Sequence, residues 1–201
     1  MELHDSGDDA VLAILADAAG DDASDRVLAL WRALIESAPP WLVAAQPAYT
    51  SLQVVFDADV DVDDVRAHLR ALQPVPRTGA HRVIEVPVRY DGPDLDDVAG
   101  LCSLPISEVV RRHAAVRYRV AFCGFVPGFA YLLGLDVGLH VPRLTSPRAV
   151  VPAGSVGIAG AQTGVYPAAS PGGWRLIGTA QRAFDPAWVA ADDVVVFKAV
   201  T

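Results

Sequence analysis

Two segments in the first half of the chain carry apolar residues at spacings of three and four, the period of a helix that buries one face. The first begins near Ser24 and ends before Pro39, and the second begins near Asp61 and ends at Pro74. Proline ends a helix because it lacks an amide donor and restricts the residue before it. The apolar positions of the two predicted helices are Val27, Leu28, Trp31, Leu34 and Ile35, and then Val62, Val65, Leu69 and Leu72.

Shorter apolar runs lie around these helices. Residues 41–45, 52–56 and 81–90 are predicted strands, and the run at residues 10–16 fits a strand or a helix equally well on its periodicity. With a strand there, the order is β-α-β-β-α-β, the split βαβ arrangement. The pattern therefore predicts a ferredoxin-like α/β domain over residues 1–90.

After residue 90 the pattern changes. Two short helices are predicted at residues 94–101 and from Ser103 or Pro105 onward. Glycine and proline then recur between aromatic and β-branched residues, which indicates short strands joined by tight turns and not a disordered linker. We expect residues 91–201 to form a closed or nearly closed β-barrel domain, which makes the fold class α+β. The predicted strands of this half are residues 117–125, 149–151, 155–159, 174–178 and 193–199.

The charge of the chain is unevenly distributed. Of a net charge of −8, residues 1–80 hold 14 acidic and 5 basic residues, a balance of −9, whereas residues 81–201 hold 10 and 11, a balance of +1. An acidic chain lacks the basic face that binding to a nucleic-acid backbone needs, so we exclude a nucleic-acid partner. The arginines of the second half are available to meet a carboxylate or another anion.

The sequence shows no signal for export or membrane insertion. Its acidic start lacks the basic and then apolar order of a signal peptide, and no apolar run reaches the roughly 18 residues of a membrane span. Cys102 and Cys123 match neither a disulfide framework nor a zinc-binding spacing. We therefore expect a soluble, cytoplasmic protein that has no metal site.

Common nucleotide and hydrolase motifs are missing. A nucleophile elbow around Ser155 would need glycine at position 153, where the chain has Ala153. No GxxxxGK[ST] phosphate loop occurs, and the only lysine is Lys198. Any chemistry with ATP is therefore expected to depend on another chain.

His113 is the ionisable residue of greatest interest. It shares the apolar face of its predicted helix with Val109 and Val110, just before a strand. One interpretation is a core histidine, or one that the dipole favours at a helix C-terminus. The other is a general acid or base that faces the mouth of the barrel.

Arg143 and Arg148 flank a constrained turn at residues 144–147. Two guanidinium groups on one loop suit the bidentate recognition of a carboxylate or a phosphate, although either arginine could instead pin the loop through backbone carbonyls. Gln162, Thr163 and Tyr166 add neutral donors and acceptors in a glycine-rich segment, where a ligand can approach backbone N–H groups.

Several long motifs occur in one order. They are GFVPGFAYL at residues 124–132, PRLTSPR at 142–148, VPAGSVGIAGAQTGVYP at 151–167 and SPGGWRLIG at 170–178. In these motifs, and along nearly its whole length, the chain resembles the KipI / allophanate hydrolase subunit 1 family, whose bacterial members include the B subunit of 5-oxoprolinase.

The resemblance implies a small N-terminal α/β domain and a C-terminal cyclophilin-like β-barrel domain. It also implies a second subunit (PxpC, or allophanate hydrolase subunit 2) and a third protein (PxpA-like), which together open 5-oxoproline to glutamate at the expense of ATP. The alternatives are a carboxyltransferase-like half-site as in urea carboxylase, and a KipI-type protein that binds and inhibits a histidine kinase. A prolyl isomerase, indicated by the barrel alone, ranks last because a fold does not carry a function.

On the 5-oxoprolinase interpretation, the expected catalytic residues are His113 for proton transfer and Arg143 and Arg148 for the anion. The chain departs from the family pattern where the usual IGRT becomes Ile177-Gly178-Thr179 and where the usual glycine turn becomes Ala191-Asp192-Asp193. The predicted substrate-binding residues are Ser155, Gly157, Gln162 and Tyr166.

Overall fold

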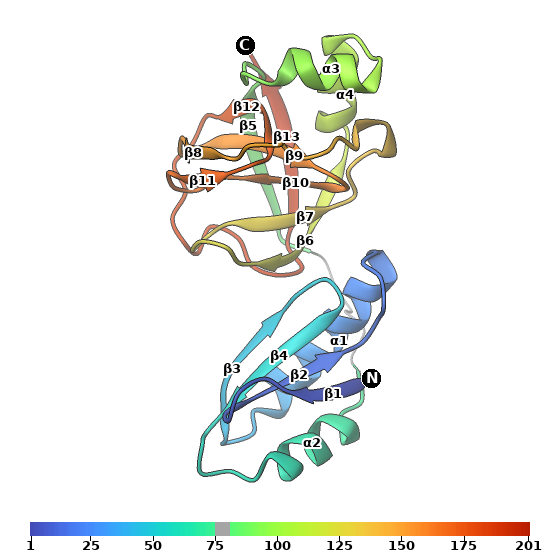
Figure 1. Ribbon diagram of the computed structural model, residues 1–201, viewed down its shortest axis with the longest axis vertical. Helices are drawn as coiled ribbons and strands as arrows, with labels where there is room; N and C mark the ends of the chain where they lie inside the picture. The colour runs from blue at the N-terminus through green and yellow to red at the C-terminus, as the bar shows by residue number, and fades with distance from the viewer. Residues whose placement is uncertain (75–80) are drawn as a thin grey trace. The chain divides into compact units, whose positions relative to one another are not determined.

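The structure, a computed structural model, describes residues 1–74 and 81–201 (Figure 1). The chain divides into two compact units, Met1–Ala80 and His81–Thr201. Each unit buries its own cluster of apolar side chains, which is what a separately stable domain requires. The fold class is α+β, as predicted.

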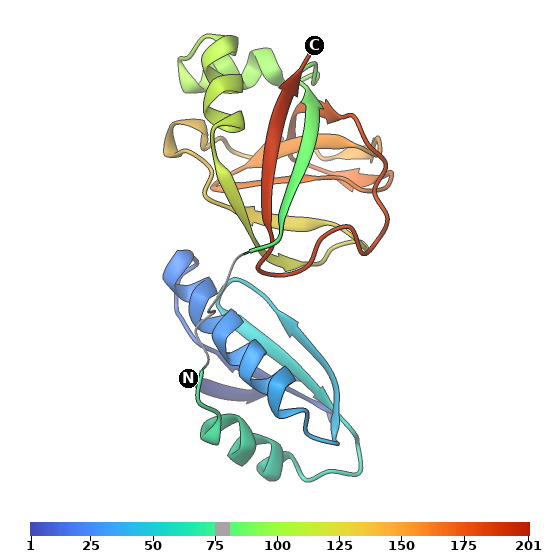
Figure 2. The ribbon, with the colours of Figure 1, turned by 180° about the vertical axis from the view of Figure 1, so that it is seen from behind.

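The first unit is a four-stranded antiparallel sheet with two helices. Alternate residues of the central strands, such as Val11 and Ala13 or Leu52 and Val54, are buried with the apolar faces of both helices. Helix α1 lies across one face of the sheet in Figure 2. The elements are β1 (Glu2–Asp5), β2 (Ala10–Ile14), α1 (Asp21–Ser37), β3 (Leu42–Pro47), β4 (Ser51–Phe56) and α2 (Val62–Ala71), with the strand order β1-β2-β4-β3.

Both helix boundaries have local causes. Helix α1 ends where Ala38 adopts the left-handed conformation (φ 41°) and its N–H bonds to the Leu34 carbonyl, immediately before Pro39. Helix α2 begins at Asp61, whose carboxylate accepts a hydrogen bond from the backbone N–H of Asp63. The predicted end of the first helix and the predicted start of the second agree with these positions, whereas α1 begins earlier than predicted, at Asp21, and α2 ends at Ala71, before Pro74.

The fourth strand of this sheet corrects the predicted topology. The β-α-β-β-α pattern from β2 to α2 is present, but the strand paired with β2 at the edge is β1, not the segment at residues 81–90. That segment forms β5 (Val83–Arg89), whose Val86 and Val88 are buried in the second unit. The division between the units therefore lies before His81, and not near residue 90. The sequence of β1, ELHD, is polar because an edge strand buries few side chains, and this hides it from a search for apolar runs.

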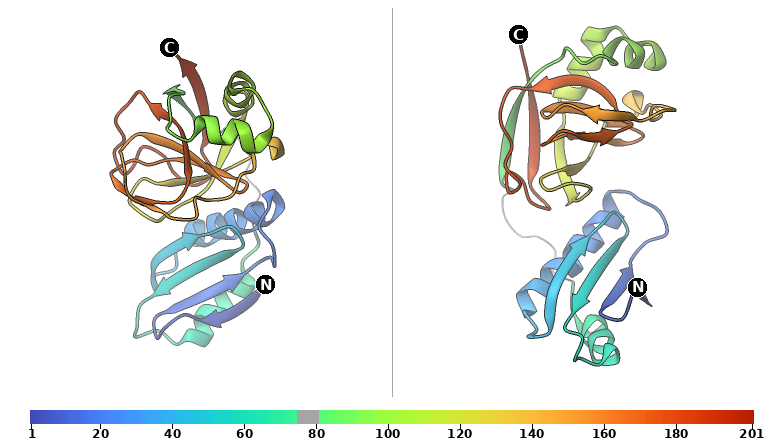
Figure 3. Two further views of the ribbon diagram at one scale, coloured as in Figure 1. Left: turned by 45° about the horizontal axis from the view of Figure 1, so that its top comes forward. Right: turned by 60° about the vertical axis from the view of Figure 1, so that its left-hand side comes forward.

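The second unit is a closed seven-stranded barrel with the order β10-β7-β6-β13-β5-β12-β9, in which β9 pairs with β10. Strands β5 and β13 run parallel, and the other neighbouring pairs are antiparallel. The two helices of this unit, α3 (Leu95–Cys102) and α4 (Ile106–Ala114), lie together at one end of the barrel (Figure 3). The elements after β5 are α3 (Leu95–Cys102), α4 (Ile106–Ala114), β6 (Arg117–Cys123), β7 (Ala130–Leu133), the 3-10 turn η1 (Val137–Leu139), β8 (Arg148–Val151), β9 (Ser155–Ala159), β10 (Gln162–Val165), β11 (Ser170–Gly172), β12 (Arg175–Ala180) and β13 (Val194–Val200).

Side chains of the barrel strands alternate between the inside and the outside, as they must on a pleated sheet. The inside holds the larger apolar cluster, which includes Val156, Ile158 and Val165. A second cluster, which we call the outer aromatic cluster, lies on the other face of β7, β9, β10 and β12. Its fully or mostly buried members are Phe129, Val151, Ala159, Tyr166, Trp174 and Leu176, with Val126 and Tyr131 packed against them.

A two-stranded ribbon of β8 and β11 carries part of this outer aromatic cluster. Val151 of β8 belongs to the cluster, and Gly172 of β11 lies so close to the Tyr166 hydroxyl that a Cβ atom at this glycine would collide with it. The barrel thus has two buried environments, one inside it and one between its outer surface and the ribbon.

Candidate functional site

His113 lies inside the barrel and is completely buried. Helix α4 carries it on the same face as Val109, and its ring stacks on Phe197 of β13 with 4.8 Å between the ring centroids. Its Nδ1 is 2.7 Å from the hydroxyl of Tyr90, and its Nε2 is 2.9 Å from the hydroxyl of Thr163. Both ring nitrogens therefore have partners from within the chain.

The direction of these hydrogen bonds follows from a carbonyl at one end. The Thr163 hydroxyl donates to the Gly157 carbonyl at 3.0 Å, and a hydroxyl has only one proton to donate. His113 Nε2 must therefore be the protonated nitrogen, and Nδ1 accepts from Tyr90. The result is a chain of three bonds, which we call the His113 relay, running from Tyr90 through His113 and Thr163 to Gly157.

Burial lowers the pKa of His113 to about 3, because the charged imidazolium would lose its hydration inside the barrel. Burial also raises the pKa of Tyr90 above its ordinary value. At neutral pH the His113 relay is thus uncharged. Of the two sequence interpretations, this environment favours a core histidine.

Arg148 lies at the start of β8 and is held by Asp94. Its Nη2 donates to Asp94 Oδ1 at 2.7 Å, and the other carboxylate oxygen accepts the backbone N–H of Leu176, also at 2.7 Å. Asp94 itself is 5% exposed, and its own N–H bonds to the Leu176 carbonyl. The carboxylate is therefore fixed to strand β12 from two sides, and it fixes Arg148 in turn.

Arg143 is exposed and has no ion-pair partner among residues 1–74 and 81–201. Its charge acts on two tyrosines of the outer aromatic cluster. Burial raises the pKa of Tyr131, and Arg143 acts in the opposite direction. Burial likewise raises the pKa of Tyr166, while the Trp174 backbone N–H, Arg143 and Arg148 lower it. The structure thus brings Arg143, Arg148 and Tyr166 into one electrostatic environment.

The other predicted binding residues are placed differently. Ser155 and Gly157 are buried in β9, where their main chains pair with the neighbouring strands, so they present no free N–H row to a ligand. Gly157 suits the packing here, since a Cβ atom at this position would lie 3.2 Å from Trp174 Cβ, a tight contact. Gln162 is partly buried at the start of β10. Tyr166 is 2% exposed beneath the ribbon.

Two residues of these networks carry no signal in the sequence: Tyr90, which completes the His113 relay, and Asp94, which orients Arg148. Thr163, expected to offer its hydroxyl to a ligand, is instead buried and bonded within the relay. Asp94 lies 54 positions before Arg148 in the chain, so local spacing carries no signal of their contact. A buried aspartate at the start of a predicted helix looks like an ordinary cap.

The two departures from the family pattern have clear structural consequences. At position 179, the Thr179 hydroxyl bonds to Asp91 Oδ1 at 2.9 Å. At position 192, Asp192 adopts φ 72°, the left-handed region that glycine favours and that Asp tolerates better than most residues. The turn before β13 therefore keeps a glycine-like backbone without glycine.

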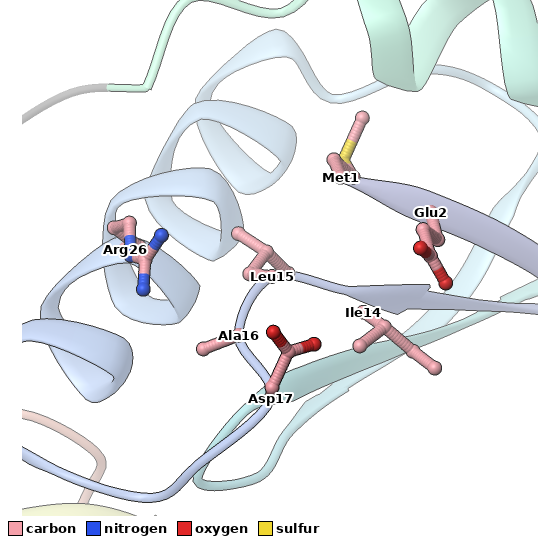
Figure 4. Close-up of a pocket in the computed structure, with 7 residues that line it drawn as sticks. All are labelled: Met1, Glu2, Ile14, Leu15, Ala16, Asp17 and Arg26. Carbon is pink, nitrogen blue, oxygen red and sulfur yellow. The ribbon is translucent and has the colours of Figure 1, made fainter.

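Other features of the described residues do not add to this site. They contain no cluster of His, Cys, Asp or Glu that could hold a metal. None of their helices is both long enough and apolar enough to span a membrane. An open pocket in the first unit is lined by Met1, Glu2, residues 14–17 and Arg26 (Figure 4), and it includes none of the predicted site residues.

Comparisons with known proteins agree with the fold. The family model described as "Carboxyltransferase domain, subdomain C and D" matches residues 1–192. The B subunit of 5-oxoprolinase from Bacillus subtilis is 38% identical over 197 residues, which cover 84% of this chain and 80% of that protein. The corresponding B subunit from Escherichia coli is 57% identical over 110 residues, 53% of this chain and 50% of that protein.

A solved structure is also similar. The crystal structure of TTHA0988 superimposes with a TM-score of 0.86 at 37% identity, over 96% of this chain and 40% of the other. The matches thus cover about half of the E. coli protein and less than half of TTHA0988. The chain belongs to the carboxyltransferase-domain family of subdomains C and D, and along most of its length it is similar to a bacterial 5-oxoprolinase B subunit.

Proposed function

We propose that this chain is one subunit of a 5-oxoprolinase-type assembly, an ATP-dependent hydrolase that opens the cyclic amide 5-oxoproline to glutamate. Two lines of support converge on this proposal. Similar proteins are named as the B subunit of 5-oxoprolinase. The observation that carries it is the pair Arg143 and Arg148 beside the outer aromatic cluster. Arg143 has no ion-pair partner among the described residues, and Arg148 is held by Asp94 through one nitrogen while its Nη1 has no partner there.

This arrangement suits the chemistry of the substrate. 5-Oxoproline has a small lactam ring and a carboxylate, and such ligands bind where apolar walls meet a few well-placed polar groups. Guanidinium groups recognise carboxylates through charge-assisted hydrogen bonds. In this proposal the arginines hold the carboxylate, and Tyr131, the partly exposed aromatic residue packed against the cluster, borders the ring. The contribution of this chain is to bind and orient the substrate.

The proton transfers of ring opening are assigned to another subunit. His113 lies inside the barrel with both nitrogens bonded and a pKa lowered to about 3, so at neutral pH it neither donates nor accepts a proton on the outer surface. We propose that His113 supports the barrel from within. This replaces the role in proton transfer that its sequence position indicates.

No residue of this chain is assigned to ATP in this proposal. The sequence has no phosphate loop, and its sole lysine, Lys198, lies 3.3 Å from Glu85 Oε1. We therefore propose that ATP is bound by the partners, a PxpC-like second subunit and a PxpA-like third protein. This chain would be inactive alone.

Reconstitution tests the proposal. The full chain would be purified alone and with each candidate partner, and glutamate would be measured after addition of 5-oxoproline and ATP. We expect a stoichiometric complex with the second subunit, and turnover only when all components and ATP are present. A chain that forms no complex and supports no glutamate formation in any combination would disprove the assignment.

A second function, binding to a histidine kinase, is favoured by one observation. Phe125 is 58% exposed and adopts φ 73°, a strained conformation for an aromatic residue, with its ring packed edge-on against Phe129 at 5.5 Å. An aromatic side chain held out in this way is typical of an anchor for another protein. If this is the function, the chain should inhibit kinase autophosphorylation, and Phe125→Ala should abolish the inhibition without lowering the melting temperature.

A further inference from the structure

The ribbon of β8 and β11 carries two buried polar atoms that have no hydrogen-bond partner among residues 1–74 and 81–201. They are Nη1 of Arg148 and Oγ of Ser170. A buried donor without a partner is costly, and more so when it is charged. Such atoms are rare in native proteins, and each calls for a cause such as a bound ligand or water.

The pairing of the ribbon shows which way these side chains face. Ser170 is opposite Val151, and Gly172 is opposite Arg148, with an irregularity in register between the two pairs. Val151 belongs to the outer aromatic cluster, and a Cβ atom at Gly172 would meet the Tyr166 hydroxyl. Paired residues share a face of a sheet, so Ser170 and Arg148 both lie on the side of the ribbon that faces Tyr166.

Asp94 determines which terminal nitrogen of Arg148 remains without a partner. It binds only Nη2, and its second oxygen is occupied by the Leu176 N–H. Asp94 therefore contacts Arg148 through one terminal nitrogen and does not form the two-pronged pair that would use both. The guanidinium is oriented by one carboxylate and keeps Nη1 for another acceptor.

We propose that Arg148 Nη1 binds the carboxylate of the substrate, and that Asp94 is the positioning residue that holds Arg148 ready for it. Arg143, exposed and unpaired among the described residues, adds a second contact from the surface. This inference rests on the proposed function, because it names the part of 5-oxoproline that this chain recognises. Pre-orientation increases affinity, because the side chain loses less freedom when the ligand binds.

The test compares 5-oxoproline with its uncharged analogue 5-oxoprolinamide. Calorimetric titration would be carried out on the full chain and on its complex with the second subunit. The wild type should prefer the acid by about tenfold or more, the effect of one charge-assisted hydrogen bond. Arg148→Lys keeps the positive charge and should still lose most of this preference. An ammonium group cannot reproduce the planar arrangement of donors that lets a guanidinium bind Asp94 and the substrate at once.

The positioning role of Asp94 needs a readout that a purely structural role would not move. Asp94→Asn keeps an acceptor for the Leu176 N–H and loses the charge that holds Arg148. We expect the affinity for the acid to fall about tenfold and that for the amide to stay within about twofold. In nitrogen-15 spectra, the Arg148 Nη signals should be separate in the wild type and averaged by rotation in Asp94→Asn. The double variant that combines Asp94→Asn with Arg148→Lys should bind the acid like Arg148→Lys alone.

The matched control is Asp97→Asn, on the same helix. Asp97 pairs with Arg175 at 3.1 Å and does not contact Arg148, so this variant should keep the preference for the acid. Equal affinity of the wild type for acid and amide, in the chain and in the complex, would overturn the inference, as would an Asp94→Asn variant that binds like the wild type. Glutamate formation with an unchanged KM in Arg148→Lys would overturn the inference about Arg148 and leave the proposed function intact. Acid-selective binding without turnover in any assembly would support the inference and disprove the proposed function.

Discussion

The inside of the barrel and its outer surface under the ribbon are both buried, yet they treat polar groups in opposite ways. Inside, every polar group of the His113 relay has a partner, and the network is uncharged. Outside, Arg148 keeps a buried nitrogen without a partner, and Arg143 has no counter-ion among the described residues. Satisfied networks stabilise a core, whereas unsatisfied groups mark a place where something binds.

The pKa values of buried groups are shifted by different causes inside and outside the barrel. Inside, burial alone lowers the pKa of His113. Outside, burial raises the pKa of Tyr131 and Tyr166, but neighbouring cations and a backbone N–H oppose it. A strongly shifted pKa therefore does not by itself identify the active residue here. The polar environment around the group is more informative.

The largest effect on stability is expected from His113→Ala. This change removes the ring that stacks on Phe197 and leaves Tyr90 and Thr163 without their partner. The free energy of unfolding should fall by about 3–5 kcal/mol, measured by urea denaturation. His140→Ala, at an exposed histidine of the same unit, should cost less than about 1 kcal/mol. A small loss of stability with complete loss of glutamate formation would return His113 to a catalytic role.

The pH dependence of stability tests the same core. His113 titrates near pH 6.5 in an unfolded chain and near 3 in the folded one. Between these values the unfolded chain binds the extra proton, so this contribution is complete above pH 6.5 and is lost as the pH falls toward 3. From pH 7 to pH 5 the wild type should lose about 2 kcal/mol more than His113→Gln. Parallel curves for the two proteins would show that the imidazole is not held neutral.

A smaller effect is expected where the ribbon meets the barrel. Gly172→Ala places a methyl group against the hydroxyl and ring of Tyr166, and overpacking of this kind costs about 1–3 kcal/mol. Gly100→Ala, in α3, meets nothing within 4 Å and should be neutral or stabilising by about 0.5–1 kcal/mol. Thermal melting would compare the two. Equal melting temperatures would mean that the ribbon moves away from Tyr166 easily.

The smallest effect on stability is expected from Arg143→Ala. The side chain is exposed and unpaired among the described residues, so the free energy of unfolding should change by less than about 0.5 kcal/mol. Binding of 5-oxoproline should nonetheless weaken, and the loss should shrink at high salt because exposed charges are screened. An unchanged affinity at low salt would remove Arg143 from the proposed site.

The helices and the presence of a barrel could be predicted from the sequence because they depend on local patterns. Apolar spacing and proline positions placed α1 and α2, and alternation indicated β6 and β13. The partner of each strand was not predictable in the same way. β5 alternates well enough to fit either unit, and β1 has almost no apolar signal.

The candidate site shows the same limit. The sequence identified Arg148 on a constrained loop, but Asp94 reaches it from 54 positions away. The two interpretations of His113 differ only in what surrounds the ring, and Tyr90, Thr163 and Phe197 come from three other strands or strand ends. Tertiary contacts decide such questions, and a single sequence does not encode them in any local period.

The parallel pairing of β5 with β13 has a consequence for biosynthesis. The first strand of the barrel lies beside its last strand, with Val83 opposite Val194 and Arg89 opposite Val200. These partners are more than a hundred residues apart in the chain. During synthesis the edge of β5 that pairs with β13 therefore stays unpaired until almost the entire barrel has been translated. The first unit, whose strands all come from its own 80 residues, can fold while the barrel is still being translated. During that interval the nascent barrel is the part of this protein most exposed to aggregation and most in need of a chaperone.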